Sequence, residues 1–161
     1  MAGFKEVVLI SEPVAAAMAY GLFVAGRKRV LVFDFGGGTL DVSVLEIDEG
    51  RFRVLATNGD SELGGADIDH AIARAVLASE TNSEACDAVD ASLLERCERA
   101  KIALSDRETY ADDSDPALTM TRKKLERLCE GIFDRCESIA SECVSMAKIK
   151  NVDEVVLVGG S

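Results

Sequence analysis

Three consecutive glycines between an apolar run and a β-rich run constrain the fold of this chain more than any other feature. Residues 36–38 are all glycine; they follow the run 30–33 and precede the run 40–47. A turn without Cβ atoms lets backbone N–H groups converge on an anion, so the segment predicts a phosphate cradle. A P-loop and a dinucleotide-binding turn are both followed by a helix, whereas the residues after Thr39 predict a strand. We therefore expect a hairpin turn that holds phosphate.

Two carboxylates, Asp34 and Asp41, bracket this turn. An aspartate at the end of a buried strand is costly unless its charge is compensated, and a hydrated Mg²⁺ carried by a nucleotide is a natural partner. Alternatively, both side chains accept hydrogen bonds from N–H groups of the turn. Glu12 stands at the expected start of a helix, where a carboxylate also favours the helix N-terminus without any ligand. The residues alone leave these alternatives open.

The predicted elements indicate an α/β chain with a mixed sheet and a mostly helical insertion. We expect a sheet subdomain from residues 1–61 and 131–161, with an inserted helical subdomain from 62–130. The expected elements are a strand at 7–10, a helix at 14–22, a buried strand at 30–33, a hairpin of strands 40–47 and 51–57, helices at 67–79 and 92–105, a loop or short irregular hairpin at 106–119, a helix at 121–148 broken near Gly131, and a buried strand at 154–158.

Size and charge exclude some classes of function. The 161 residues fit one domain, and 48% hydrophobic residues suffice for a core. A formal net charge of -11 argues against a general nucleic-acid or anionic-membrane binder, because such surfaces need an excess of Lys and Arg. We therefore expect no nucleic-acid and no membrane partner.

The five cysteines, at 86, 97, 129, 136 and 143, form no CxxC pair, and His70 is the only histidine. A zinc site is therefore not expected. Three of the cysteines are seven residues apart, which places them on one stripe of a helix with four apolar residues. We expect this stripe to pack in the core as small apolar side chains do. It comprises Leu125, Cys129, Ile132, Cys136, Ile139, Cys143 and Met146.

The predicted helix 92–105 carries a polar edge beside an apolar one. Glu98, Lys101 and Ser105 are three and four residues apart and share one face. This edge can grip a ribose or a base, although a surface ion pair between Glu98 and Lys101 is the ordinary alternative. The adjacent face, expected to pack inward, consists of Leu93, Cys97, Ala100 and Leu104.

Several segments resemble the DnaK-type 70-kDa heat-shock chaperones in order and spacing. They are 11–22 (SEPVAAAMAYGL), 32–43 (VFDFGGGTLDVS), 56–60 (ATNGD), 63–65 (LGG), 97–101 (CERAK) and 155–161 (VVLVGGS). Actins and sugar kinases share that family's fold but not these strings. The resemblance implies an actin-like ATPase, or ribonuclease H-like, lobe, and the matching segments are those of the second lobe of the nucleotide-binding domain.

The resemblance also implies roles for single residues. Residues matching the glycine turn contact the β- and γ-phosphates, and Glu12 matches a carboxylate beside the hydrolysis site. The implied catalytic residues are Glu12, Asp34, Thr39 and Asp41, of which Asp34 and Asp41 serve Mg²⁺ through bound water. The implied nucleotide-binding residues are Gly36, Gly37, Gly38, Thr39, Gly65, Glu98, Lys101, Ile102, Ser105, Gly159, Gly160 and Ser161.

Two departures from the family pattern stand out. The region from Asp67 to Met120 is shorter and more divergent than usual, above all from Ala111 to Pro116. Ala66 stands where the family usually has an acidic or polar residue. Nucleotide exchange factors that grip the 62–130 subdomain are therefore not expected to recognise it in the usual way.

For the intact protein, the resemblance implies a chaperone that couples Mg-ATP hydrolysis to binding of unfolded peptides. The cofactors are ATP or ADP and Mg²⁺, with K⁺ as a further candidate, and the partners are peptide clients, co-chaperones and exchange factors. We find no first-lobe phosphate loop and no peptide-binding domain in the sequence, so we expect an inactive, monomeric fragment. A cytoplasmic location is the default, with an organelle or the endoplasmic reticulum not excluded. The alternatives are a non-catalytic, chaperone-like regulatory module, or another actin-fold ATPase or sugar kinase.

Overall fold

The computed structural model describes residues 3, 5–22, 26–80, 89–113 and 115–161. The chain divides into two compact units. The first, here called the sheet unit, comprises Met1–Asp34, Asp41–Gly59 and Ile139–Val158. The second, the helical unit, comprises Phe35–Leu40, Asp60–Ser138 and Gly159–Ser161. The subdomain boundaries expected from the sequence stay a prediction.

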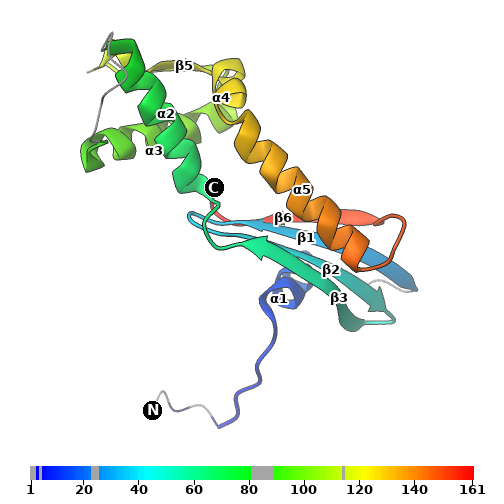
Figure 1. Ribbon diagram of the computed structural model, residues 1–161. Coiled ribbons are helices and arrows are strands. Elements are labelled where there is room, and N and C mark those ends of the chain that lie inside the picture. The colour runs from blue at the N-terminus through cyan, green and yellow to red at the C-terminus, as the bar shows by residue number, and fades with distance from the viewer. Residues whose placement is uncertain (1–2, 4, 23–25, 81–88, 114) are drawn as a thin grey trace. The chain divides into compact units, whose positions relative to one another are not determined.

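The sheet has four strands in the order β3-β2-β1-β6 (Figure 1). Strands β1 (Arg27–Phe35) and β6 (Glu154–Val158) are parallel, with Val32 opposite Val156. Only four residues separate β1 from β2 (Leu40–Asp48), so these neighbours run antiparallel. Strand β3 (Arg51–Asp60) follows β2 through a two-residue turn at Glu49 and Gly50, both with positive φ. The mixed sheet predicted from the sequence is confirmed.

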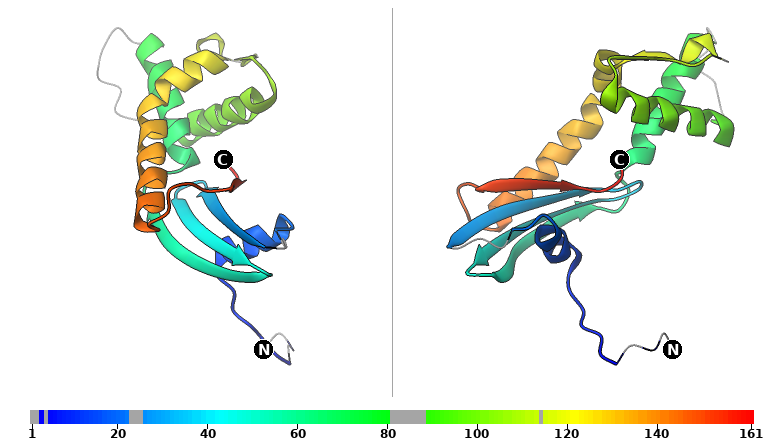
Figure 2. Two further views of the ribbon diagram at one scale, coloured as in Figure 1. Left: turned by 90° about the vertical axis from the view of Figure 1, so that its right-hand side faces the viewer. Right: turned by 180° about the vertical axis from the view of Figure 1, so that it is seen from behind.

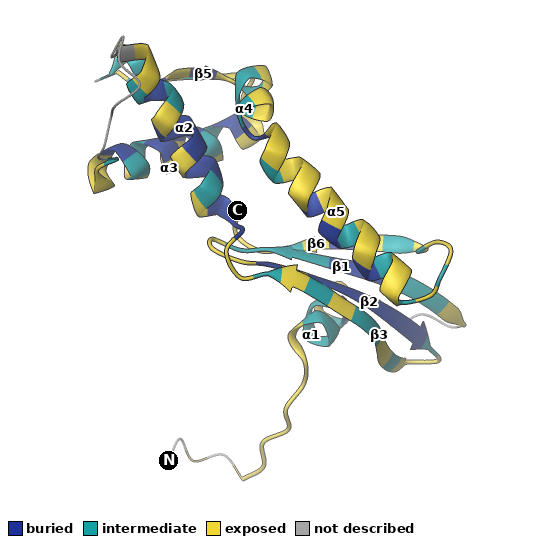
Figure 3. Ribbon diagram, in the orientation of Figure 1, coloured by how far each residue is buried: buried dark blue, intermediate teal, exposed yellow. Residues whose placement is uncertain are grey.

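Helices pack on both faces of this sheet (Figure 2). Helix α1 (Glu12–Ala19) buries Ala17 fully against Val30, Val32 and Val156. On the other face, Cys143 of helix α5 (Glu130–Met146) donates through its thiol to the Val42 carbonyl oxygen at 3.4 Å. Strand β2 is almost wholly buried, although polar residues interrupt its sequence (Figure 3).

Two strand predictions need correction. Residues 7–10 form no strand, and all four side chains are exposed (Figure 3). A strand requires a neighbour to which it can bond, and no described strand pairs with this segment. Strand β6 has the predicted bounds, but it is not buried on both faces, because Val155 and Leu157 are 50% and 65% exposed. It lies at the sheet edge, where one face is left uncovered in the described chain.

The helical unit is built around α2 (Gly65–Glu80) and α3 (Ala91–Asp106). The side chain of Asp90 caps α3 by accepting from Leu93 N–H at 2.6 Å. The apolar face predicted for this helix is confirmed, since all four of its residues are buried. The core of the unit includes Ile72, Cys97, Leu104, Leu118, Met120 and Cys129.

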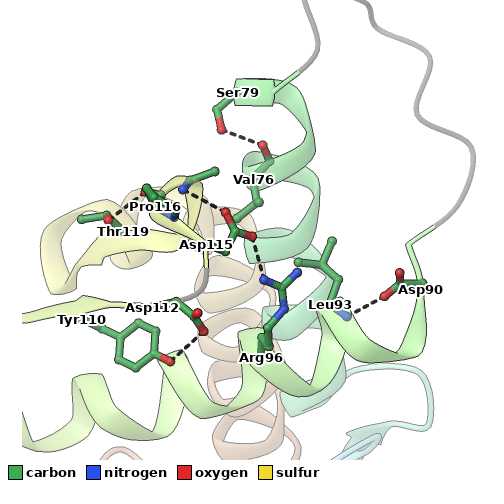
Figure 4. Close-up of polar contacts among 11 residues, drawn as sticks. Val76, Ser79, Asp90, Leu93, Arg96, Tyr110, Asp112, Asp115, Pro116 and Thr119 are labelled. Carbon is green, nitrogen blue, oxygen red and sulfur yellow. Dashed lines mark hydrogen bonds and ion pairs between the residues drawn. The ribbon is translucent and has the colours of Figure 1, made fainter.

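The predicted irregular hairpin is present as β4 (Thr109–Ala111) and β5 (Thr119–Thr121), which pair antiparallel around the short 3₁₀ turn Pro116–Leu118. Figure 4 shows how it is tied to α3. One carboxylate oxygen of Asp115 accepts from Ala117 N–H at 3.0 Å, and the other accepts from the Arg96 guanidinium at 2.8 Å.

The long predicted helix is two helices, α4 (Arg122–Leu128) and α5, and the break at Cys129 lies close to Gly131, as predicted. Cys129 leaves helical geometry and is fully buried in the helical core. Cys136 and Cys143 are also buried, as predicted, whereas Met146 is 56% exposed because it lies in the last turn of α5. Cys86 lies outside the described residues. No helix in the described chain has the length and apolar character needed to cross a bilayer.

Candidate functional site

The glycine turn has the geometry of an anion cradle. Gly36 N–H donates to the Thr39 carbonyl oxygen at 2.9 Å and closes the turn. Gly37, Gly38 and Thr39 are exposed. In the described part of the chain, no acceptor receives the N–H groups of Gly37 or Gly38, which leaves both donors available to an anion.

The N-terminus of α2 is bonded directly to this turn. Gly65 N–H donates to the Gly36 carbonyl oxygen at 2.9 Å, and Ala66 N–H donates to the Gly37 carbonyl oxygen at 2.8 Å. Gly64, which the sequence marked only as part of the segment 63–65, packs closely on the turn: a Cβ there would lie 2.5 Å from Gly38 N. The backbone contact therefore requires glycine at 64, and it brings the positive end of the helix dipole to the turn.

The segment 159–161 also contacts the glycine turn. Gly159 has φ of 103°, and a Cβ on it would collide with the backbone of Phe35. The Ser161 hydroxyl donates to the Gly36 carbonyl oxygen at 2.9 Å. Three segments far apart in the sequence, at 36–39, 64–66 and 159–161, thus meet in the helical unit.

A cavity of about 420 Å³ lies beside this cluster, lined by residues of the helical unit. Six of its lining residues are among those named from the sequence, and α2 and α3 supply six more that the sequence pattern did not single out as a site. The first six are Gly37, Glu98, Lys101, Ile102, Gly160 and Ser161; the others are Ala66, Asp69, His70, Ala91, Leu94 and Glu95.

Ser105 does not line this cavity, although it shares a helix face with Glu98 and Lys101. Its side chain is exposed, and its carbonyl oxygen accepts from the Arg122 guanidinium at 3.2 Å. Ser105 lies near the end of α3, where that guanidinium holds the last carbonyl groups. The structure therefore brings together two of the three residues of the predicted polar edge.

Lys101 is held by Asp69, not by Glu98. Its ammonium lies 3.0 Å from Asp69 Oδ2 and donates to the Gly65 carbonyl oxygen at 3.1 Å. The Lys101 and Asp69 side chains are only 13% and 12% exposed. Burial raises the pKa of Asp69 above its usual value, and the hydrogen bond from Lys101 opposes that rise. The pair locks α3 to the start of α2.

One oxygen of this carboxylate is left without a hydrogen bond. Asp69 Oδ1 also lies 3.0 Å from the Lys101 ammonium, but it lacks the alignment of a hydrogen bond and is shielded from solvent. Asp69 could not be picked out from the sequence, because only the packing of α2 on α3 places it opposite Lys101. In the sequence, Asp69 looks like any aspartate on the surface of a helix.

A second cavity, of about 320 Å³, lies in the sheet unit and collects the predicted carboxylates. Glu12 lines it from the first turn of α1, Asp34 from the end of β1 and Asp41 from the start of β2. Its other polar lining side chains are Ser11, Ser43, Thr57 and Asn58. Glu12 and Asp41 are exposed, and Asp34 is half-buried.

These oxygen groups suit a hard, hydrated cation. Among the described residues, no three acidic, histidine or cysteine side chains are close enough to coordinate one metal ion directly. Carboxylate and hydroxyl oxygens can accept hydrogen bonds from the water shell of a hydrated Mg²⁺. The expectation that Asp34 and Asp41 serve Mg²⁺ in this way stays a prediction.

The sequence model of the family described as Hsp70 protein matches the chain over residues 1–161, its whole length. The chain belongs to the Hsp70 family. Curated relatives include a heat shock cognate HSP70 protein of Trypanosoma brucei brucei, 42% identical over 100% of this chain and 27% of the relative. They also include the chaperone proteins DnaK of Akkermansia muciniphila, 40% identical over 99% of this chain and 28% of the relative, and of Prochlorococcus marinus, 38% identical over 100% and 28%.

The chain thus spans less than a third of the length of the Hsp70 relatives that it matches. The alignment with the Trypanosoma protein runs over 180 residues, against 161 in this chain, so it opens gaps here. We expect these gaps between Asp67 and Met120, and that placement stays a prediction.

Proposed function

We propose that this chain is one lobe of the ATP-binding and hydrolysing domain of an Hsp70 chaperone, with an actin-like fold. In the intact protein, Mg-ATP hydrolysis would be coupled to the binding of unfolded peptides. The observation that carries the proposal is the glycine turn, whose two free N–H donors lie next to a helix N-terminus bonded to the same turn. Membership of the Hsp70 family supports it.

The nucleotide's phosphates belong on the N–H groups of Gly37 and Gly38, and its nucleoside belongs in the cavity of about 420 Å³. That volume is within the range of small-ligand sites. The apolar side chains of Leu94 and Ile102 can contact a base, and Glu98 offers acceptors to hydroxyl groups. Gly160 and Ser161 close the cavity beside the turn.

Mg²⁺ would be served through water by Asp34 and Asp41, which flank the turn along the chain, and Glu12 lines the same cavity. When bound, Mg²⁺ neutralises charge on the phosphate oxygens. K⁺ is a further candidate ligand of these oxygen groups.

The proposed reaction is attack of water on the γ-phosphorus, with ADP as the leaving group and inorganic phosphate as the other product. The protein contributes position and charge stabilisation. The free N–H groups of the turn and the Thr39 side chain would hold γ-phosphate oxygens. Glu12 matches a carboxylate that lies beside the hydrolysis site in the family.

The chain alone is proposed to bind nucleotide weakly and to hydrolyse ATP negligibly, since it spans only 27–28% of its relatives. Clients, co-chaperones and exchange factors would act on the intact protein, with exchange factors at residues 62–130. We propose a monomer that is cytoplasmic by default. Turnover by the purified chain at a rate comparable to that of an intact Hsp70 would contradict this part of the proposal.

Calorimetric titration of ADP with and without Mg²⁺ tests the site directly. The wild-type chain should bind ADP, and Mg²⁺ should tighten that binding. Asp34→Asn should bind ADP without Mg²⁺ as the wild type does, but Mg²⁺ should no longer raise its affinity for ADP. Asp134→Asn, at an exposed aspartate of α5, should match the wild type under both conditions. Equal Mg²⁺ dependence in all three proteins would remove Asp34 from the site.

A further inference from the structure

His70 lies on α2, one turn after the residues bonded to the glycine turn, and its ring is held in a defined orientation. Its Nδ1 lies 2.7 Å from the Ala66 carbonyl oxygen. A carbonyl oxygen only accepts, so Nδ1 must carry the proton. In the neutral ring, Nε2 then bears a free lone pair. The hydrogen bond to Ala66 thus makes Nε2 an acceptor.

The ring lines the cavity of about 420 Å³ together with acidic groups of α3. Glu95 and Glu98 both line it, and both offer acceptors. The ammonium of Lys101 is occupied by Asp69 and by the Gly65 carbonyl oxygen. This part of the cavity is therefore rich in acceptors, which repel phosphate and suit a ligand group that donates hydrogen bonds.

Ala66 limits the polar side chains that α2 contributes to the cavity. It is one helical turn before His70, lines the same cavity and contributes only a methyl group there. His70 and the already paired Asp69 are therefore the polar side chains that α2 supplies to the lining. Of the parts of a nucleotide, phosphate has no strong donor and adenine has one amino group, whereas ribose has two adjacent hydroxyl donors.

We propose that Nε2 of His70 accepts a hydrogen bond from a ribose hydroxyl of the bound nucleotide, so that His70 helps to select ribonucleotides. The inference deepens the proposed nucleotide site and rests on it. Neither the glycine turn nor the cavity lined by Glu12, Asp34 and Asp41 depends on His70. The role of His70 can therefore be wrong while the proposed nucleotide site is right.

The test compares His70→Asn with His70→Gln. The Asn side chain can replace Nδ1 but is too short to place an acceptor at Nε2, whereas Gln can place its amide oxygen near that position. ADP, its 2′-deoxy and 3′-deoxy analogues and IDP are titrated into the full chain by calorimetry at about pH 8, where histidine is ordinarily neutral. Circular dichroism checks that each variant keeps its helix content.

The wild type should bind ADP roughly 2- to 12-fold more tightly than His70→Asn, which is the net worth of one hydrogen bond. His70→Gln should recover most of that affinity. For the deoxy analogue that lacks the contacted hydroxyl, wild type and His70→Asn should bind alike. If His70→Asn binds ADP as tightly as the wild type does, the assignment to ribose is wrong. It is also wrong if the affinity difference between the two proteins disappears only with IDP. In both cases the proposed nucleotide site itself is unaffected. If the wild type binds no ADP, the proposed function fails and the inference fails with it.

Discussion

Replacing Lys101 by methionine should destabilise the helical unit strongly. The substitution keeps the length of the side chain but removes the cation that faces Asp69, and both side chains are nearly buried, at 13% and 12% exposed. Removing one partner of a fully buried ion pair costs about 3–5 kcal/mol, because the other charge is left uncompensated. Since some exposure remains, we expect a loss of about 3 kcal/mol in the free energy of unfolding at neutral pH.

The loss should depend on pH with a defined sign. Burial already raises the pKa of Asp69 in the folded chain, and the Lys101 hydrogen bond is the main opposing cause. In Lys101→Met the folded-state pKa rises further, so the folded chain takes up a proton before the unfolded chain does. The penalty is full above the folded pKa and is relieved as the pH falls through it toward the unfolded value. The deficit should therefore shrink as the pH falls from neutrality toward the ordinary pKa of an aspartate.

Urea unfolding followed by circular dichroism measures both effects. Asp69→Asn combined with Lys101→Met should lose less stability than the two single changes added together, because the double variant leaves no buried charge. Arg99→Met is the matched control: its partner Glu95 is 70% exposed, and the change should cost no more than about 0.5 kcal/mol. A coupling between Asp69 and Lys101 below about 0.5 kcal/mol, or a stability loss independent of pH, would show that the two side chains do not form a buried charge pair.

Three further predictions follow from single contacts. Gly64→Ala should weaken ADP binding at least about tenfold with helix content retained, because the new Cβ would lie 2.5 Å from backbone of the glycine turn; unchanged affinity in calorimetry would contradict it. Burial raises the pKa of the Cys97 and Cys129 thiols to about 11. At pH 8, peptide mapping should therefore find that iodoacetamide labels them at least about 100-fold more slowly in the folded chain than in the urea-unfolded chain. Folded and unfolded labelling rates within about tenfold of each other would contradict this. Arg96→Met should cost about 1–3 kcal/mol in urea unfolding, because Asp115 loses its charged donor; a cost equal to that of an exposed arginine would show that the ion pair does not hold the β4–β5 hairpin.

Local sequence pattern predicted the elements that position the site. The apolar run before the glycines and the β-rich run after Thr39 were enough to predict a strand–turn–strand, and the structure confirms it as β1 and β2. The bounds of β6 and the inward face of α3 were also predictable, because both depend on which residues recur at strand or helix spacing.

The remaining features depend on tertiary contacts that no local pattern encodes. Asp69 is distinguished only by the helix packed against it, and Gly64 only by the backbone of the glycine turn. For the outer side chains of β6 and for residues 7–10, the apolar sequence predicted burial, but these side chains are exposed. An apolar run can form a buried strand only where neighbouring segments pair with it and cover it.

A nitrogen-15 NMR titration of the chain with Mg-ADP tests whether the glycine turn and the cavity beside it bind nucleotide, because it detects weak binding and locates it on the backbone. We expect saturable shift changes that cluster at the glycine turn, at 64–66, at 98–102 and at 159–161. Saturable changes centred on the exposed end of α5, or no changes at millimolar ADP, would contradict the assignment of this chain as a nucleotide-binding lobe.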